Sequence, residues 1–142
     1  MEYLEQNKKK LLLVVEDDAG WVLIIKHILK GRNIAAIYAE TGEEALKLIG
    51  EHEDVDCMFL DVSLGTGISG LDLAAKIKMK QCYKDTPMIA MTAHEKKRMG
   101  DYEELGFTGY LQKPYSPDKF GALLDTYHLQ NEVPIKVSDY LD

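Results

Sequence analysis

Five short, largely apolar runs are spaced along the chain, and each is followed by a segment with helical periodicity. The runs cover residues 11–15, 34–39, 57–60, 88–91 and 110–112. Apolar runs of this length without polar alternation are typical of parallel strands that are buried on both faces. The pattern therefore predicts five strand-helix repeats in a single domain.

Capping residues and glycines mark where the first three helices begin and end. Gly31 closes the first helix, and Thr41-Gly42-Glu43-Glu44 is a capping box that starts a second helix through Ile49. A third helix is predicted from about Ser69 to Gln81. The side chains expected on buried faces are Trp21, Ile24, Ile25, Ile28 and Leu29 in the first helix, and Leu71, Ala74, Ala75 and Ile77 or Lys78 in the third.

The last two helices differ in the strength of their signals. Residues 95–105 predict a weak helix, because Gly100 interrupts it before Gly106 ends it. Ser116-Pro117 is a strong start signal, because serine caps a helix and proline fits its first turn. The side chains expected to point inward from this last helix are Phe120, Leu123, Leu124 and Tyr127.

Alternating strands and helices predict an α/β fold, in which a parallel sheet has right-handed crossovers and helices on both faces. Five-stranded sheets of this doubly wound, flavodoxin-like class most often have the strand order 2-1-3-4-5. Ligands then bind at the carboxyl ends of strands 1 and 3, where the order reverses. Strand 1 ends at Glu16 and Asp17, and strand 3 ends at Asp61, so these three acids are expected to converge.

The composition narrows the class of protein further. With 142 residues, of which 46% are hydrophobic and 29% charged, the chain is expected to be a soluble globular domain. The net charge of −7 argues against nucleic acid as the main partner. Cys57 and Cys82 lack disulfide or metal-site spacing, so reduced thiols are expected. No apolar run could span a bilayer and residues 1–10 lack a signal-peptide core, so we expect a cytoplasmic protein without membrane contact.

Three carboxylates gathered at one sheet edge repel one another unless a proton or a cation compensates their charge. Hard oxygen ligands with room for water favour Mg²⁺. Lys113, after strand 5, adds a positive charge, and Thr92, at the end of strand 4, adds a hydroxyl. A cation, an ammonium and a hydroxyl around one carboxylate suit a phosphoryl group, whose oxygens carry negative charge. Asp61 is therefore the predicted nucleophile, which would form an acyl phosphate.

Four motifs at these strand ends belong together. They are Leu13-Val14-Val15-Glu16-Asp17, Phe59-Leu60-Asp61, Met91-Thr92-Ala93 and Lys113-Pro114. The combination resembles the response regulator receiver domain, the phosphoacceptor module of two-component signalling, over residues 11–129. The resemblance implies that Glu16, Asp17 and Asp61 hold Mg²⁺ together with the main-chain carbonyl of Ser63.

The resemblance also assigns the residues that respond to phosphorylation. It implies that Thr92 and Lys113 contact the phosphoryl group on Asp61, that Tyr110 is the switching aromatic residue, and that the Lys113-Pro114 peptide is cis. The implied donor is a histidine kinase or a histidine phosphotransfer protein of a phosphorelay. A downstream protein is expected to bind the face formed by the fourth helix, the fifth strand and the last helix.

The domain boundaries follow from the same match. Residues 11–129 form the expected receiver domain, residues 1–10 a lead-in, and residues 130–142 a tail too short for an output domain. The protein is expected to be a switch that catalyses only its own phosphorylation and dephosphorylation, and no enzyme acting on other substrates.

The loop after Asp61 departs from the family pattern, because it lacks the common Met-Pro and is one residue longer. Gly65-Thr66-Gly67-Ile68-Ser69-Gly70 spells the dinucleotide-binding fingerprint G-x-G-x-x-G. That fingerprint should follow its strand directly and be matched by an acid at the end of the next strand, and neither condition holds. A flexible loop is the favoured interpretation.

Two other functions fit part of the pattern. A pseudo-receiver would bind proteins without ever being phosphorylated, although the complete set of acids, hydroxyl and lysine argues against it. A Mg²⁺-dependent phosphohydrolase would also use an aspartate nucleophile, but it needs a second acid two residues later, where this chain has Ser63.

Overall fold

The computed structural model describes residues 9–93, 99–127 and 129. Five parallel strands form one sheet in the predicted order β2-β1-β3-β4-β5. The strands are β1 (Lys10–Val15), β2 (Ile34–Ala39), β3 (Cys57–Asp61), β4 (Met88–Thr92) and β5 (Gly109–Gln112). Each strand lies within one residue of its predicted run at either end.

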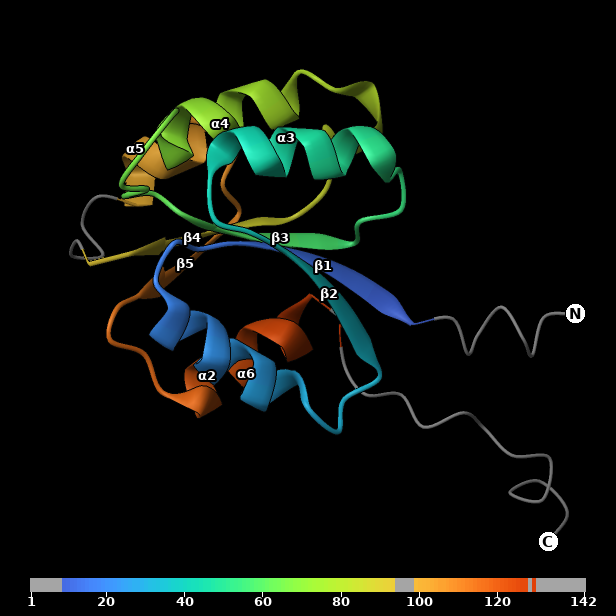
Figure 1. Cartoon of the computed structure of the whole chain (residues 1–142), viewed down its shortest axis with the longest axis vertical. Coiled ribbons are helices and arrows are strands. Elements are labelled where there is room, and N and C mark those ends of the chain that lie inside the picture. The colour runs from blue at the N-terminus through green and yellow to red at the C-terminus, as the bar shows by residue number, and fades with distance from the viewer. Residues whose placement is uncertain (1–8, 94–98, 128, 130–142) are drawn as a thin grey trace, which may run out of the picture.

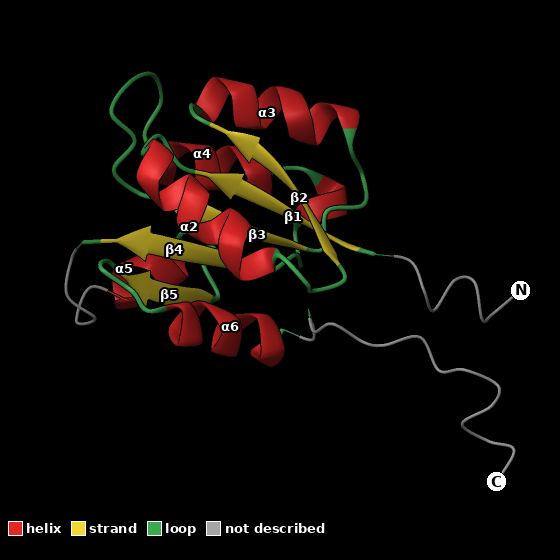
Figure 2. Ribbon diagram, turned by 60° about the horizontal axis from the view of Figure 1, so that its bottom comes forward, coloured by secondary structure: helices red, strands yellow, loops and turns green. Residues whose placement is uncertain are grey.

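The connecting helices cover both faces of the sheet, which confirms the doubly wound α/β fold. The helices are α2 (Ala19–Leu29), α3 (Gly42–Glu51), α4 (Gly70–Lys78), α5 (Met99–Glu104) and α6 (Pro117–Thr126), with a 3-10 turn, η1 (Gln81–Tyr83), after α4. Helices α3, α4 and α5 lie on one face and α2 and α6 on the other (Figure 1). The strand arrows in Figure 2 point the same way, so the carboxyl ends share one edge of the sheet.

The apolar core has two layers, one on each face of the sheet. Along β1, Leu13 and Val15 belong to the layer under α3 and α4, whereas Leu12 and Val14 belong to the layer under α2 and α6. All four side chains are fully buried. Burial on both faces explains why this strand is a continuous apolar run with no polar alternation.

Side-chain caps begin the helices where the sequence predicts them. Thr41, Ser69 and Ser116 each accept a hydrogen bond from the main-chain N–H three residues later, at 3.1, 3.0 and 3.2 Å. Asp18 caps α2 in the same way. The first N–H groups of a helix have no partner within it, so each cap fixes where a helix leaves the sheet edge.

Some helix boundaries and faces differ from the prediction. Helix α4 ends at Lys78, before the predicted Gln81, and the side chain of Lys78 donates hydrogen bonds to main-chain carbonyls of the turn that follows. Helix α3 continues through Gly50 to Glu51, and a Cβ atom added at Gly50 would meet no neighbouring atom, so no close contact there requires the helix to stop. On α4, Leu73 is fully buried although it was not expected to be, and Ala75 is exposed.

The fourth predicted helix is described only in part. Helix α5 begins at Met99, and residues 95–98 of the prediction lie outside the described residues. Gly106 follows its end with a φ of 98°, in the left-handed region that glycine favours, as expected for a helix stop. The predicted lead-in and tail fall almost wholly outside the described residues.

The remaining expectations from composition concern cysteines and membranes. Cys57 and Cys82 are both free thiols, as predicted. Burial raises the pKa of Cys57 to about 12, so this thiol stays protonated. Among the described residues, no helix combines the length and the apolar character needed to cross a bilayer.

Candidate functional site

The three acids predicted to converge lie together at the carboxyl edge of the sheet. One carboxylate oxygen from each of Glu16, Asp17 and Asp61 lies within 4.8 Å of the other two. The register of β1 and β3 pairs Val15 with Leu60, so the residues that follow them emerge side by side. Glu16 is 1% exposed and Asp61 is 4% exposed, whereas Asp17 faces solvent.

Lys113 brings a positive charge to this cluster from the loop after β5. Its ammonium donates hydrogen bonds to Glu16 Oε1 and, at 3.2 Å, to Asp61 Oδ2. Desolvation lowers the pKa of Lys113, but the hydrogen bond to Glu16 and the charges of both acids outweigh it, so the pKa is raised overall. Lys113 therefore stays charged between two buried carboxylates. The predicted cis peptide between Lys113 and Pro114 is confirmed.

Main-chain N–H groups hold the second oxygen of each buried acid. Asp61 Oδ1 accepts a hydrogen bond from the N–H of Ser63 at 2.8 Å. Glu16 Oε2 accepts one from the N–H of Asp18 at 3.2 Å. Both carboxylates are thus held from two sides, by main chain and by ammonium, before any ligand arrives.

The electrostatics of the cluster favour uptake of a positive charge. Burial, followed by the hydrogen bond and charge of Asp61, raises the pKa of Glu16 to about 7, although Lys113 acts in the opposite direction. One ammonium is therefore not enough to neutralise this edge of the sheet. A divalent cation would restore the balance, and three carboxylates are the hard oxygen ligands that Mg²⁺ prefers. The donor set fits the predicted ion, and the Ser63 carbonyl as a further ligand stays a prediction.

The raised pKa of Glu16 has a measurable effect on stability. Its folded-state pKa, about 7, lies above the ordinary value of 4.5, so its contribution to stability is complete below 4.5 and is lost as pH rises through 7. In metal-free buffer, the free energy of unfolding of the wild type should fall between about pH 5 and about pH 8. We expect this fall to exceed that of Glu16→Gln, which has no proton to lose at this position, by about 2–3 kcal/mol. Urea unfolding of both proteins measures the difference. A constant difference across this range would contradict the prediction, and saturating Mg²⁺ should reduce the loss.

Thr92 ends β4 at the same sheet edge and is fully buried. Its main-chain carbonyl accepts a hydrogen bond from the N–H of Lys113 at 2.7 Å, and its hydroxyl lies 3.5 Å from that of Tyr102. The ring of Tyr102 in turn stacks on Tyr110, the predicted switching residue, with centroids 6.3 Å apart. Sequence reasoning missed Tyr102, whose one signal was an aromatic side chain in the helix before Tyr110.

The glycine-rich loop after β3 is tied to the site at two points. Asp17 Oδ2 accepts a hydrogen bond from the N–H of Gly65 at 2.9 Å, and Glu43 Oε1 accepts one from Ile68 at 2.7 Å. A side chain at Gly70 would collide with the main-chain carbonyl at the end of β3. The loop was expected to be flexible, but two carboxylates anchor it, one from Asp17 of the site and one from Glu43 of α3. The contact of Glu43 was not predicted from the sequence.

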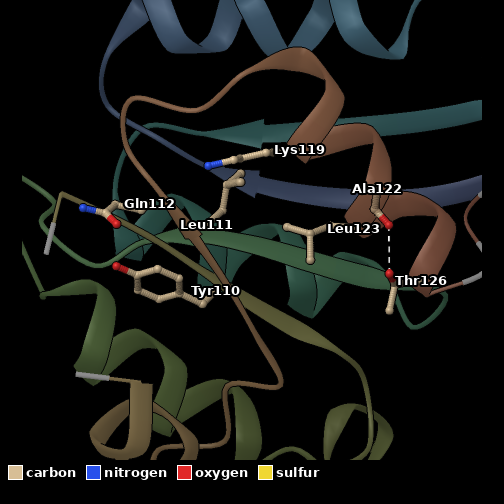
Figure 3. A pocket seen from close by; sticks show the side chains of 7 residues that line it. All are labelled: Tyr110, Leu111, Gln112, Lys119, Ala122, Leu123 and Thr126. Carbon is tan, nitrogen blue, oxygen red and sulfur yellow. Dashed lines mark hydrogen bonds between the residues drawn. The ribbon is translucent and has the colours of Figure 1, made fainter. Parts of the chain in front are cut away.

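A groove of about 520 Å³ lies between β5 and α6 (Figure 3). Its lining residues are Tyr110, Leu111 and Gln112 from β5 and Lys119, Ala122, Leu123 and Thr126 from α6. The side chains of Leu111 and Leu123 form its apolar floor, and Lys119 extends over one side (Figure 3). The groove lies on the face predicted to bind a downstream protein.

Comparison with known proteins agrees with this geometry. The family model described as the response regulator receiver domain matches residues 12–125. The transcriptional regulatory protein ResD of Bacillus subtilis is 32% identical over 116 residues, which cover 80% of this chain and 46% of ResD. This chain thus spans about half the length of that relative.

Two further relatives match over nearly their whole length. The polar-differentiation response regulator DivK of Brucella ovis is 29% identical over 83% of this chain and 95% of DivK. The response regulator protein TrrA of Thermotoga maritima, solved in complex with Mg²⁺-BeF, superposes with a TM-score of 0.71. TrrA is 30% identical over 83% of this chain and 98% of its own.

Proposed function

Because the chain belongs to the family of response regulator receiver domains, we propose that it is a Mg²⁺-dependent phosphoacceptor switch of a two-component system. In this proposal, Asp61 accepts a phosphoryl group from a histidine kinase or a histidine phosphotransfer protein. The observation that carries it is the ammonium of Lys113 held between Glu16 and Asp61 beside a third carboxylate.

The geometry around Asp61 suits nucleophilic attack by one defined oxygen. Oδ1 accepts a hydrogen bond from the main-chain N–H of Ser63, whereas Oδ2 accepts one from the Lys113 ammonium, the group that would pair with a phosphoryl oxygen. We propose that Oδ2 attacks phosphorus and forms the acyl phosphate, while the donor nitrogen leaves with the electron pair of the broken bond. Lys113 remains protonated and neutralises a phosphoryl oxygen. Mg²⁺, when bound to Glu16, Asp17 and Asp61, supplies further charge neutralisation at the same place.

Phosphorylation is proposed to change the position of Thr92. A phosphoryl group on Asp61 is a stronger hydrogen-bond acceptor for the Thr92 hydroxyl than Tyr102, whose hydroxyl lies at the long distance of 3.5 Å. Movement of Thr92 would change the environment of Tyr102 and of Tyr110, which stacks on it. A population shift at the face of α5, β5 and α6 would follow and change affinity for a downstream protein.

The groove between β5 and α6 is the proposed contact point on that face. Its floor is apolar and Tyr110 forms part of its wall, so a change at Tyr110 alters the surface that a partner meets.

We also propose that residues 11–129 are the functional module, that it works in the cytoplasm, and that it catalyses no reaction beyond its own phosphorylation and dephosphorylation.

Phosphorylation of the intact chain by a small-molecule donor tests the proposal. The protein is incubated with acetyl phosphate and Mg²⁺ and weighed by mass spectrometry, with a parallel sample in which EDTA removes the metal. We expect a gain of one phosphoryl group with Mg²⁺ and no gain with EDTA. No gain in either sample would contradict the proposal and favour a pseudo-receiver that is never phosphorylated.

A further inference from the structure

The glycine-rich loop, residues 64–69, contacts the acidic cluster but has no part in the proposed mechanism. Its main chain meets the site at Gly65, whose N–H donates a hydrogen bond to Asp17 Oδ2 at 2.9 Å. Asp17 is one of the three acids proposed to hold Mg²⁺. The position of the loop therefore affects how one proposed metal ligand is held.

The hydrogen bond from Gly65 cannot restrain Asp17 unless the loop is itself restrained. The bond is exposed to solvent, so water can replace the Gly65 N–H as the partner of the carboxylate. This exchange changes the free energy little, and an unrestrained loop gains conformational entropy when the bond breaks. The loop can orient Asp17 only if a second contact orders the loop.

The first turn of α3 supplies that second contact. Glu43 Oε1 accepts a charge-assisted hydrogen bond from the N–H of Ile68 at 2.7 Å. A Cβ atom added at Gly67 would collide with the same carboxylate, and Gly67 has a φ of 73°. The Ile68 side chain occupies the space that a Cβ atom at Gly42 would need. The main chain of the loop therefore lies directly on Glu43, in an approach that requires glycine at position 67.

We propose that Glu43 is a positioning residue of the metal site, which holds the loop so that Gly65 keeps Asp17 in the orientation that binds Mg²⁺. This inference rests on the proposed function. Glu43 is not a member of the cluster of three acids, and it acts through the main chain between Ile68 and Gly65. A group that orients a metal ligand in advance strengthens metal binding, because the ligand loses less freedom when the ion binds.

Glu43→Ala removes the carboxylate that holds the loop and leaves all three clustered acids in place. Mg²⁺ alone is titrated into the full chain, and binding is followed by calorimetry and by the fluorescence of Trp21, the single tryptophan. We expect the Kd for Mg²⁺ to rise about 3- to 10-fold. Glu43→Gln keeps an oxygen that can accept the hydrogen bond from Ile68, so its Kd should stay within about twofold of the wild-type value.

Glu44→Ala is the matched control for loss of charge. Glu44 is the next residue of the same turn and is also exposed, but its Oε2 accepts a hydrogen bond from the N–H of Glu40, just before α3. This variant should lose some stability to urea, because a contact at the start of the helix is lost, and should bind Mg²⁺ with the wild-type Kd. An effect of charge alone would change the Kd of both alanine variants.

Gly67→Ala tests the same contact from the side of the loop. The added Cβ atom would displace the Glu43 carboxylate, so the Kd for Mg²⁺ should rise, and combining this change with Glu43→Ala should add little. Gly31→Ala is its control, because Gly31 has a φ of 85° but a Cβ atom there would meet nothing within 4 Å. Both glycine variants should lose stability through backbone strain, and only Gly67→Ala should lose affinity for Mg²⁺.

The outcomes distinguish the inference from the proposed function. A wild type that binds Mg²⁺ and a Glu43→Ala variant with a Kd within about twofold of it would overturn the inference alone. An equal rise in Kd for Glu43→Ala and Glu43→Gln, or for Glu43→Ala and Glu44→Ala, would assign the effect to charge and overturn it as well. A wild type that binds no Mg²⁺ would overturn the proposed function, and the inference with it.

Discussion

Asp61→Asn is expected to abolish the phosphoryl gain that the wild-type chain shows with acetyl phosphate and Mg²⁺. The amide keeps the shape of the side chain, and its oxygen can still accept the hydrogen bond that the N–H of Ser63 donates to Oδ1 at 2.8 Å. It lacks the anionic oxygen that attacks phosphorus, so incorporation should fall at least about 100-fold, to background. Intact-protein mass spectrometry measures the result.

Asp118→Asn is the control for this experiment. Asp118 is an exposed acid in the first turn of α6, so the same change in charge occurs away from the site. The control should gain one phosphoryl group at the wild-type rate. Undiminished incorporation into Asp61→Asn would place the phosphoryl group on another residue and contradict the assignment of the nucleophile.

Lys113→Met should produce the largest loss of stability at the site. Methionine keeps the length and the apolar stem of the side chain but removes the ammonium that pairs with Glu16 and Asp61. Both acids are almost fully buried, so two carboxylates are left without a cation. We expect the free energy of unfolding to be about 3 kcal/mol lower than that of the wild type in metal-free buffer at about pH 7.5, as measured by urea unfolding.

Acidification separates charge from packing in this variant. Protonation of Glu16, whose pKa is already about 7 with Lys113 present, relieves the uncompensated charge, so the loss should shrink at about pH 5.5. Lys119→Met on α6 controls for removing an exposed lysine and should change stability by less than about 0.5 kcal/mol. An equal loss for Lys113→Met at both pH values would assign the effect to packing and refute the electrostatic explanation.

Sequence patterns predicted the strands better than the faces of the helices. A strand buried on both sides leaves a continuous apolar run, as Leu12 and Leu13 illustrate from opposite core layers. A helix face depends on how far the helix is rotated against the sheet. Ile24 fits the apolar spacing of α2, yet its side chain is 40% exposed. On α4, the sequence placed Leu71 and not Leu73 on the buried face, whereas Leu73 is fully buried in the structure.

Contacts within the site were predictable only where topology alone brings residues together. Glu16 and Asp61 converge because β1 and β3 are neighbours, which the strand order implies. The bond from Gly65 to Asp17 spans 48 residues and depends on the path of one loop. The approach of Tyr102 to Thr92 likewise depends on how α5 packs on the sheet.

The sequence by itself determined the order of strands and helices, the caps that begin the helices, and the acids, hydroxyl and lysine at the strand ends. These features depend on short-range periodicity and on residue chemistry, which a linear chain displays directly. Only the tertiary structure decided that Glu16 holds its proton to about pH 7, and that the hydroxyl of Tyr115 is buried without a partner. Charge state and hydrogen bonding depend on burial and on neighbours far apart in the chain, and these exist only once the sheet and its helices have packed.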